Sequence, residues 1–350
     1  MAAPTFTPRS VAPALPIRMI ALDIDGTLVD DDLALRDRTV AAIRQAIRRG
    51  IHVSLVTGRM TTSAVRFAET LGLTAPVIGY QGALIREMPV RAHEVGRLLR
   101  HRPLDPAVAR DAVSWSRARG LDPHVNHLER LVIRADDPRV DDYSAFLGTR
   151  ATRVDDLVAW IQRPVTKIVA VGPPGLPMRN LAAARAAFAG RADVTVAHPR
   201  FLEFVASGVS KGAAVRWMAR RTGLDLANTL AIGDQLNDLE MISAVGHGVA
   251  MPSAPPAVLS AARYVAASLA NEGSAEIIER IALAGARDAF RASLEFAERA
   301  RVLRAEPAEP AEPAELADAE LAELAELAEL AELADAELAG LEHPRVGSIA

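Results

Sequence analysis

Short apolar runs alternate with helical patterns in residues 19–85 and again after residue 200. The runs lie at 19–22, 51–55, 76–85 and 229–233, and the first and last of them end directly before aspartates. A continuous apolar run of this length is typical of a strand buried on both faces of a parallel sheet. The alternation therefore predicts an α/β fold with a Rossmann-like, doubly wound and mostly parallel sheet.

Residue patterns typical of helices lie between and after the predicted strands. Apolar residues recur at helical spacing over 40–47, and Gly50 follows them as a C-terminal cap. Ser210 is a suitable N-cap for a helix over 211–221. Further short strands are expected at 247–251 and 263–267, and a closing helix is expected over 274–283.

The middle of the chain, residues 86–199, has a different composition. It holds 18 Lys and Arg, 13 Asp and Glu and five His, with turn signals such as VGPPGLP at 171–177. Short strands are expected at 130–134, 166–171 and 193–198, and helices near 106–119 and 178–189. We therefore expect an α+β module at 86–199, inserted between the two halves of a discontinuous core at 18–85 and 200–285.

Both ends of the chain are expected to lie outside that core. Residues 1–17 contain several prolines and no continuous apolar stretch, which favours a flexible leader over a signal peptide. Residues 286–350 are expected to form a low-complexity tail of Ala, Glu, Leu and Pro, partly helical or disordered. For the repeats in 305–350 we favour a solvated appendage, and a helix that binds a protein partner or self-associates is the alternative.

Charge is distributed unevenly along the chain. Residues 305–350 hold 13 acidic residues and one arginine, whereas the first 304 residues hold 39 basic and 31 acidic residues. The globular part is therefore mildly basic, which suits a small anionic substrate but is too diffuse to indicate nucleic acid. No apolar run approaches the roughly 20 residues that span a bilayer. The lack of cysteine excludes disulfides and fits a cytoplasmic location.

Polar residues follow several of the predicted strands. Asp23 and Asp25 follow the first strand, Thr57 follows the second and Asp234 follows a later one, while Lys211 begins a helix. Open α/β sheets bind ligands at the edge where their parallel strands end. Carboxylates there favour a hard divalent cation, Mg²⁺ above all, and a lysine with a hydroxyl favours a phosphate. The set predicts a site for phosphoryl transfer.

Four motifs carry a resemblance to a known family. They are DIDGTLVD at 23–30, VTGR at 56–59, VSKG at 209–212 and GDQLNDLEMI at 233–242. In order and spacing they resemble motifs I to IV of the haloacid dehalogenase (HAD) superfamily. The late insertion, together with GVSKG and HGVAM, resembles the Cof-type, class IIB capped phosphatases. This resemblance covers about residues 18–284 and implies that the module at 86–199 is a substrate-specificity cap of type C2B.

The resemblance implies a role for each motif residue. Asp23 is expected to be the nucleophile that forms an aspartyl phosphate, and Asp25 to be the general acid and base. Magnesium is expected to bind Asp23, the backbone carbonyl of Asp25 and Asp234, with Asp238 as a ligand or beside them. The other expected catalytic and substrate-binding residues are Thr57, Gly58, Arg59, Gln81, Lys211 and Asn237.

Some of these residues also have an ordinary structural interpretation. Asp25 could be a turn residue, Thr57 a helix-capping hydroxyl and Lys211 a solvated surface lysine. Arg59 could equally form a structural ion pair, and Asn237 is expected to orient the loop or the phosphate rather than to bind metal.

Substrate choice is expected to depend on the inserted module and on Gln81. Gln81 stands where relatives usually carry Asn, so its longer side chain is expected to change reach or specificity. A polar and basic cluster could meet a polar or second anionic group of the substrate, or could be a solvated basic hairpin. Its members are His124, Asn126, His127, Arg130 and Arg134.

The sequence therefore predicts a Mg²⁺-dependent phosphatase of small phosphorylated metabolites. Sugar phosphates are the first expectation, and cofactor phosphates such as pyridoxal phosphate or flavin mononucleotide are the next. No nucleic-acid or membrane partner is expected. A phosphomutase of the same superfamily is the nearer alternative, and a scaffold protein acting through the acidic residues 305–350 is the alternative from another class.

Overall fold

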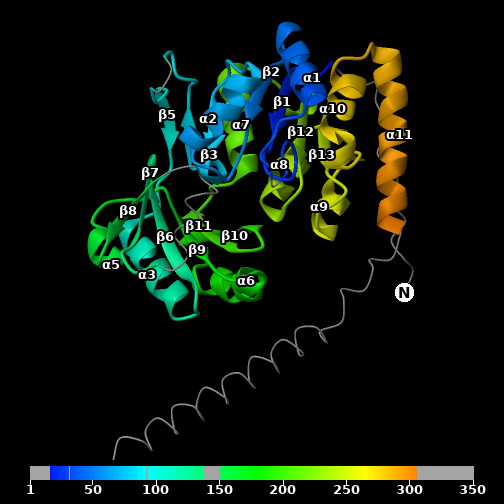
Figure 1. Ribbon diagram of the computed structural model, residues 1–350. Coiled ribbons are helices and arrows are strands. Elements are labelled where there is room, and N and C mark those ends of the chain that lie inside the picture. Colours follow the sequence, from blue (N-terminus) through cyan, green and yellow to red (C-terminus); the bar gives the residue numbers. More distant parts are fainter. Residues whose placement is uncertain (1–15, 31, 92–93, 138–149, 306–350) are drawn as a thin grey trace, which may run out of the picture. The chain divides into compact units, whose positions relative to one another are not determined.

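The computed structural model describes residues 16–30, 32–91, 94–137 and 150–305. Its central sheet has five strands in the order β14-β13-β12-β1-β2, and every neighbouring pair runs parallel (Figure 1). The strands are β1 (Met19–Leu22), β2 (His52–Leu55), β12 (Thr229–Gly233), β13 (His247–Ala250) and β14 (Tyr264–Val265). The predicted Rossmann-like sheet is confirmed.

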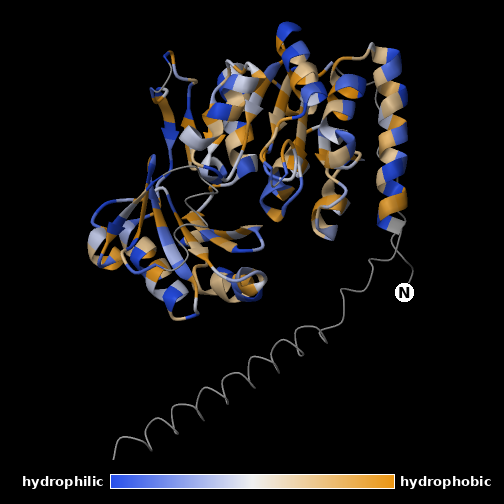
Figure 2. Cartoon of the chain, in the orientation of Figure 1, coloured by the Kyte–Doolittle hydropathy of each residue, from blue (hydrophilic) through white to orange (hydrophobic). Residues whose placement is uncertain are grey.

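Alternate residues of β1 explain why helices cover both faces of this sheet. Ile20 and Leu22 pack against α1 and α2, whereas Met19 and Ala21 pack against α7 and α8. The core helices are α1 (Asp37–Arg48), α2 (Thr61–Leu71), α7 (Lys211–Thr222), α8 (Leu239–Ala244), α9 (Pro256–Ala261) and α10 (Gly273–Ile277). Figure 2 shows the apolar residues gathered on the central strands. Within the described ranges, no helix combines the length and the apolar character needed to cross a membrane.

The stretch 76–85, which is expected to form one strand, forms two antiparallel strands. β3 (Val77–Gly79) touches the central sheet through a bridge between Val56 and Ile78, and β4 (Leu84–Arg86) turns back along β3 to pair with β5 (Leu98–His101). Between them lies the short 3₁₀ turn η1 (Tyr80–Gly82), in which Tyr80 and Gln81 have φ values of 53° and 59°. Two successive non-glycine residues in the left-handed region are not signalled by the apolar pattern.

A second sheet of six strands forms the inserted module. Its order is β10-β11-β9-β6-β7-β8, and α3 (Pro106–Arg117), α5 (Leu157–Trp160) and α6 (Leu176–Ala187) belong to the same module. The strands are β6 (Asp122–His127), β7 (Arg130–Arg134), β8 (Ala151–Val154), β9 (Lys167–Val171), β10 (Ala192–His198) and β11 (Phe201–Ala206). The expected strands and helices are present. Residues from 200 onward are expected in the core, whereas β11 pairs with β9 and β10 and extends this sheet to Ala206.

The six-stranded sheet contacts the core through one face and one turn. On that face Val169, Val171 and Phe201 pack with Met60 and Tyr80 of the core. In the turn between β6 and β7, the Glu129 carboxylate accepts hydrogen bonds from the backbone N–H and hydroxyl of Thr62, at 3.2 and 3.0 Å. Glu129 therefore caps the N-terminus of α2, the helix that follows the second motif.

The expected tail at 286–350 is helical at its beginning, and this part packs on the core instead of lying outside it. Residues 286–305 form the 20-residue helix α11 (Ala286–Ala305), which packs against the core through Ala289, Ala292 and Phe296. The Phe296 ring is fully buried, with its centroid 6.5 Å from that of Tyr264. Figure 2 shows apolar and polar residues alternating along this helix. The acidic repeats from residue 306 and the leader up to residue 15 lie outside the described residues, and Ile17 is already buried.

Candidate active site

Three aspartates meet at the carboxyl edge of the central sheet. Asp23 follows β1 and Asp234 follows β12, the adjacent parallel strand, so the strand pairing brings them together. Asp238 ends the 3₁₀ turn η3 (Leu236–Asp238) that comes next. One carboxylate oxygen from each aspartate lies within 4.8 Å of the others, and the three residues are only 4%, 4% and 0% exposed.

Lys211 is inserted into this cluster. Its Nζ lies 2.8 Å from Asp23 Oδ1 and 2.7 Å from Asp238 Oδ1, and its side chain is fully buried. Ser210 starts the helix as expected, since its Oγ accepts a hydrogen bond from the N–H of Ala213 at 2.9 Å. The surface-lysine interpretation of Lys211 is therefore wrong.

Asp238 serves mainly to organise its neighbours. Its Oδ1 accepts from Lys211, and its Oδ2 accepts from the backbone N–H groups of Asp234 and Gln235 at 3.2 and 3.1 Å. Asp234 has looser contacts, with Oδ1 accepting from the Thr27 hydroxyl at 3.3 Å and Oδ2 from Gln235 Nε2 at 3.1 Å. More acceptor capacity for a further cation is left on Asp234 than on Asp238.

Burial and like charge disfavour the ionised forms of these aspartates. Burial raises the pKa of Asp23 well above its usual value, Asp238 adds to the rise and Lys211 opposes it. Burial and Asp238 likewise raise the pKa of Asp234 to about 7. Burial acts to lower the pKa of Lys211, but Asp23 and Asp238 outweigh it and the pKa is raised. One ammonium does not balance three carboxylates, so the donor set fits a divalent cation with oxygen ligands.

Asp25 is held by Arg59. The Arg59 Nε donates to Asp25 Oδ2 at 2.8 Å and to Oδ1 at 3.1 Å, and the end of the guanidinium also donates to Oδ1. Arg59 is only 1% exposed and its guanidinium lies 5.4 Å from the centre of the Phe67 ring. Asp25 keeps 35% of its side chain exposed, so it is the partner that can reach solvent or a substrate. Of the two expectations for Arg59, the ion pair is the one that the structure contains.

Thr57 lies at the end of β2 with its hydroxyl placed for donation. Its Oγ1 accepts the backbone N–H of Arg59 at 3.1 Å, which leaves the hydroxyl proton for another acceptor. Thr57 is fully buried.

Two motif glycines are needed because other side chains occupy the space beside them. A Cβ on Gly26 would lie 2.2 Å from Asp234 Oδ2, and Gly26 has a φ of 73°. A Cβ on Gly58 would lie 2.4 Å from Gln81 Nε2. Both glycines therefore let neighbouring loops close around the site.

Gln81 joins two of these loops to the inserted module. Its Oε1 accepts from Asn237 Nδ2 at 2.9 Å, and its Nε2 donates to Glu203 Oε2 at 2.6 Å. Glu203 also binds Lys167, whose Nζ reaches the carbonyl oxygen of Gly58. Sequence reasoning missed Lys167 and Glu203, although each is a single charge within an otherwise apolar strand, KIVAV and FLEFVA.

The cluster expected in the inserted module does lie on a hairpin, but its members are dispersed. His124 and Asn126 are fully buried in β6, so the interpretation as a wholly solvated hairpin is wrong for them. His124 Nε2 lies 2.8 Å from Asp137 Oδ2. The remaining members are His127, whose ring packs on Trp160, Arg134, which pairs with Asp136, and Arg130, which is exposed.

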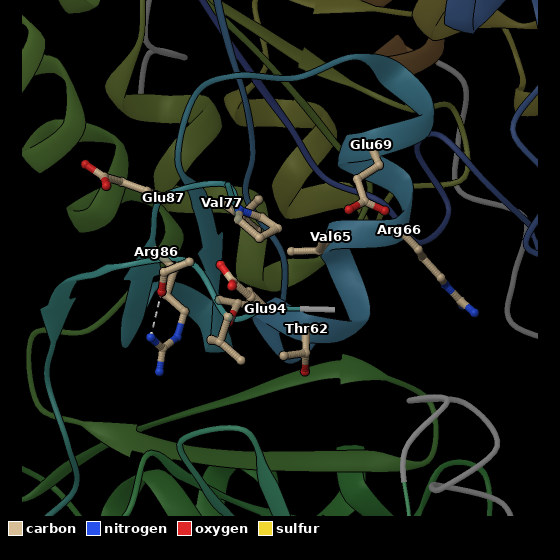
Figure 3. Close-up of a pocket in the computed structure, with 12 residues that line it drawn as sticks. Thr62, Val65, Arg66, Glu69, Val77, Arg86, Glu87 and Glu94 are labelled. Carbon is tan, nitrogen blue, oxygen red and sulfur yellow. Dashed lines mark hydrogen bonds between the residues drawn. The ribbon is translucent and has the colours of Figure 1, made fainter. Parts of the chain in front are cut away.

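Two pockets in the described residues have linings separate from the aspartate cluster. One, of about 250 Å³, lies between α2 and the loop after β4, and Figure 3 shows Thr62, Val65 and Arg66 lining one side and Arg86 the other. The second, of about 230 Å³, includes Arg130 and Trp160 in its lining. Both linings lack the motif aspartates and Lys211, so the aspartate cluster lies outside these two pockets.

Comparisons with known proteins agree with this arrangement. Residues 20–278 match the family of haloacid dehalogenase-like hydrolases. The HMP-PP phosphatase of Serratia proteamaculans is 29% identical over 248 residues, which cover 69% of this chain and 86% of that protein. A haloacid dehalogenase-like hydrolase of known structure from Bacteroides thetaiotaomicron is 27% identical with a TM-score of 0.66, covering 76% of this chain and 99% of that one. A HAD subclass IIB sugar phosphatase shares the fold at 19% identity, with a TM-score of 0.63 and coverage of 75% and 98%.

The chain therefore belongs to the haloacid dehalogenase-like hydrolases. Its sheet core with an inserted α+β cap is the fold that it shares with the subclass IIB sugar phosphatase and with a HAD/COF-like hydrolase of Plasmodium vivax.

Proposed function

We propose that the chain is a Mg²⁺-dependent phosphatase that hydrolyses phosphate monoesters of small metabolites, sugar phosphates first, through a phosphoryl group carried on Asp23. The observation that most supports this proposal is the arrangement of charged side chains around Asp23. A buried carboxylate lies against the Lys211 ammonium at 2.8 Å, with Asp234 and Asp238 beside it, at the edge of the sheet where phosphate ligands bind.

The cation site would be formed by Asp23, Asp234 and the backbone carbonyl of Asp25, with Asp238 beside them. When bound, the cation would neutralise negative charge that builds up on the phosphoryl oxygens. Asp238, whose two oxygens already accept three protein hydrogen bonds, would fix Lys211 and the Asp234 backbone in place.

The chain's own residues account for the two chemical steps. A carboxylate oxygen of Asp23 attacks phosphorus, the bond from phosphorus to the leaving oxygen breaks, and Asp25 donates a proton to that oxygen. Asp25 then accepts a proton from water, whose oxygen attacks phosphorus and releases phosphate and free Asp23. Arg59 holds the Asp25 carboxylate in the structure, so this contact must loosen before Asp25 donates a proton to the leaving oxygen.

Lys211 and Thr57 would hold the transferred group. Two of the three N–H bonds of the Lys211 ammonium point to Asp23 and Asp238, which leaves the third for a phosphoryl oxygen. The Thr57 hydroxyl proton is available for another oxygen. Since this leaves little covalent work for the protein, positioning and charge neutralisation would supply most of the rate.

The test is the variant Asp23→Asn, which keeps the shape and removes the nucleophile. With an aryl phosphate and Mg²⁺, we expect release of inorganic phosphate to fall by at least about 10³-fold. Asp111→Asn is the matched control, because Asp111 is an exposed residue of the cap paired with Arg191. Turnover retained by Asp23→Asn would refute the nucleophile assignment. Phosphoryl transfer back to substrate without release of phosphate would identify a phosphomutase instead.

A further inference from the structure

The second of the two pockets lies on the face of the six-stranded cap sheet that is turned away from the core. Side chains alternate along β6, so His127 shares its face with Val125, which belongs to the same apolar cluster as Leu157 of α5. Arg130 pairs with His127 across β6 and β7 and lies on the same face. Figure 1 shows α3 and α5 on this side of the sheet. The pocket is therefore opposite the face that packs on the core.

The lining of this pocket is cationic. Besides Val165 it contains an indole, an imidazole, an amide and two guanidinium groups, which belong to Trp160, His127, Gln162, Arg130 and Arg163. No carboxylate is among these lining residues. Within the ranges that the structure describes, neither arginine forms an ion pair. Two guanidinium groups without counter-ions favour an anion, because carboxylate or phosphate oxygens accept their N–H groups in pairs.

The rest of the lining favours a ring. The Trp160 ring meets the His127 ring edge-on, with centroids 6.1 Å apart, and Val165 in the same lining is buried. Nδ1 of His127 is buried and has no hydrogen-bond partner among the described residues, so it offers a polar atom to a ligand. The volume of about 230 Å³ is below the roughly 300–1,000 Å³ of pockets for drug-sized ligands. A ligand of one ring with one or two acid groups therefore suits the pocket.

A four-residue turn joins this pocket to the core. Its outer residues, His127 and Arg130, line the pocket. Its inner residues, Leu128 and Glu129, bind the core, Leu128 through its carbonyl oxygen. The Glu129 carboxylate accepts from the backbone N–H and hydroxyl of Thr62 at 3.2 and 3.0 Å, at the start of the helix that follows the second motif. A ligand that holds the two outer residues therefore acts on the core contacts of the two inner ones.

From these observations we infer that the pocket is an effector site for a small aromatic anion, whose acid groups bind Arg130 and Arg163 and whose ring packs on Trp160. The ligand is not the substrate, because the pocket lies on the far face of the cap sheet. By holding the ends of the turn, the ligand favours the conformation in which Glu129 caps α2, the helix that begins just after Thr57. The substrate-binding state is then more populated, so KM falls. The binding site stands by itself, whereas the effector role rests on the proposed phosphatase function.

Calorimetry with three probes, in the absence of Mg²⁺, tests the site. Phthalate carries a ring and two carboxylates, succinate carries two carboxylates without a ring, and benzamide carries a ring without a charge. We expect phthalate to bind with a Kd below about 1 mM, and succinate and benzamide to bind at least about tenfold more weakly. Arg163→Gln should weaken the binding of phthalate at least about tenfold. Arg117→Gln is the matched control, because it removes the same charge from an exposed residue of α3 outside the lining, and it should leave the Kd unchanged.

Kinetics with p-nitrophenyl phosphate and excess Mg²⁺ test the effector role. At saturating phthalate, the KM of the wild-type protein should fall about fivefold, and the KM of Arg163→Gln should not respond to phthalate. Far-ultraviolet circular dichroism establishes that both arginine variants are folded.

Each outcome bears on one part of the inference. No binding of phthalate, equal affinities in the wild-type protein and Arg163→Gln, or equal binding of benzamide would overturn the site. Phthalate that raises KM in both proteins would bind at the active site instead, which would also overturn it. Phthalate bound in the pocket without a change in KM would overturn the effector role. A wild-type protein that releases no phosphate from any ester would overturn the phosphatase function and the effector role, whereas the calorimetry would still decide the site.

Discussion

His247 should make the stability of the molecule fall in mild acid. It lies in β13 with 3% exposure, and its Nδ1 is 3.2 Å from the Tyr264 hydroxyl. Burial lowers the pKa of His247 to about 4, with Arg263 acting in the same direction. Because the folded pKa is below the unfolded value of 6.5, the unfolded chain binds the proton more readily. Protonation in the window between these two pKa values therefore favours unfolding.

The magnitude follows from the difference between the two pKa values. At pH 7 the group is neutral in both states and its effect is close to zero. Near pH 5 the unfolded imidazole is almost fully charged while the folded one is mostly neutral, which lowers the free energy of unfolding by about 2 kcal/mol. Below pH 4 the loss levels off at roughly 3 kcal/mol.

Urea unfolding at pH 7 and pH 5, followed by circular dichroism, measures this effect. The variant His247→Gln does not titrate and can still bind the Tyr264 hydroxyl. Between pH 7 and pH 5, the free energy of unfolding should fall by about 2 kcal/mol more in the wild-type protein than in the variant. The comparison cancels the contributions of the other titrating groups. Equal losses in the two proteins would refute the reasoning, because they would show that burial does not keep His247 neutral.

Two further predictions concern the end of the chain. Phe296→Ala should lower the free energy of unfolding by about 3–5 kcal/mol, because Phe296 is fully buried between Tyr264 and the guanidinium of Arg280. Phe290→Ala on the same helix is the control, because Phe290 is 37% exposed and its loss should lower the free energy of unfolding far less. Similar losses in the two variants would mean that α11 does not pack on the core through Phe296. Deletion of 306–350 should leave kcat and KM for phosphate release unchanged, and altered turnover would contradict this expectation. We propose that the same deletion would abolish any self-association or protein binding by the acidic repeats.

The aspartates of the sheet edge could be predicted because strand ends are local features. A continuous apolar run identifies β1 or β12, and the first polar residue after it marks the carboxyl end. In a parallel sheet all such ends lie at the same edge, so Asp23 and Asp234 are brought together without any knowledge of loop structure. The same reasoning located Thr57, and the helix-cap signal of Ser210 located Lys211.

The residues that connect cap and core could not be predicted because their contacts depend on sheet order and register. Gln81 and Glu203 are 122 residues apart and meet only because β11 lies in the middle of the cap sheet. Their position also depends on the two left-handed residues of the turn at Tyr80, which have no clear sequence signal. The one local sign of these contacts is a charged residue within an apolar strand. It indicates that Lys167 and Glu203 have polar partners, but it does not identify the partners.

The C-terminal helix shows how composition can conceal a local pattern. Ala289, Ala292, Phe296 and Ala300 recur at intervals of three and four residues and are all buried in α11. This spacing is typical of one helix face that packs on a core. The repeats that begin after residue 305 dominate the composition of the region, so composition alone places the whole of 286–350 in the tail. Periodicity, and not composition, separates the helix from the repeats.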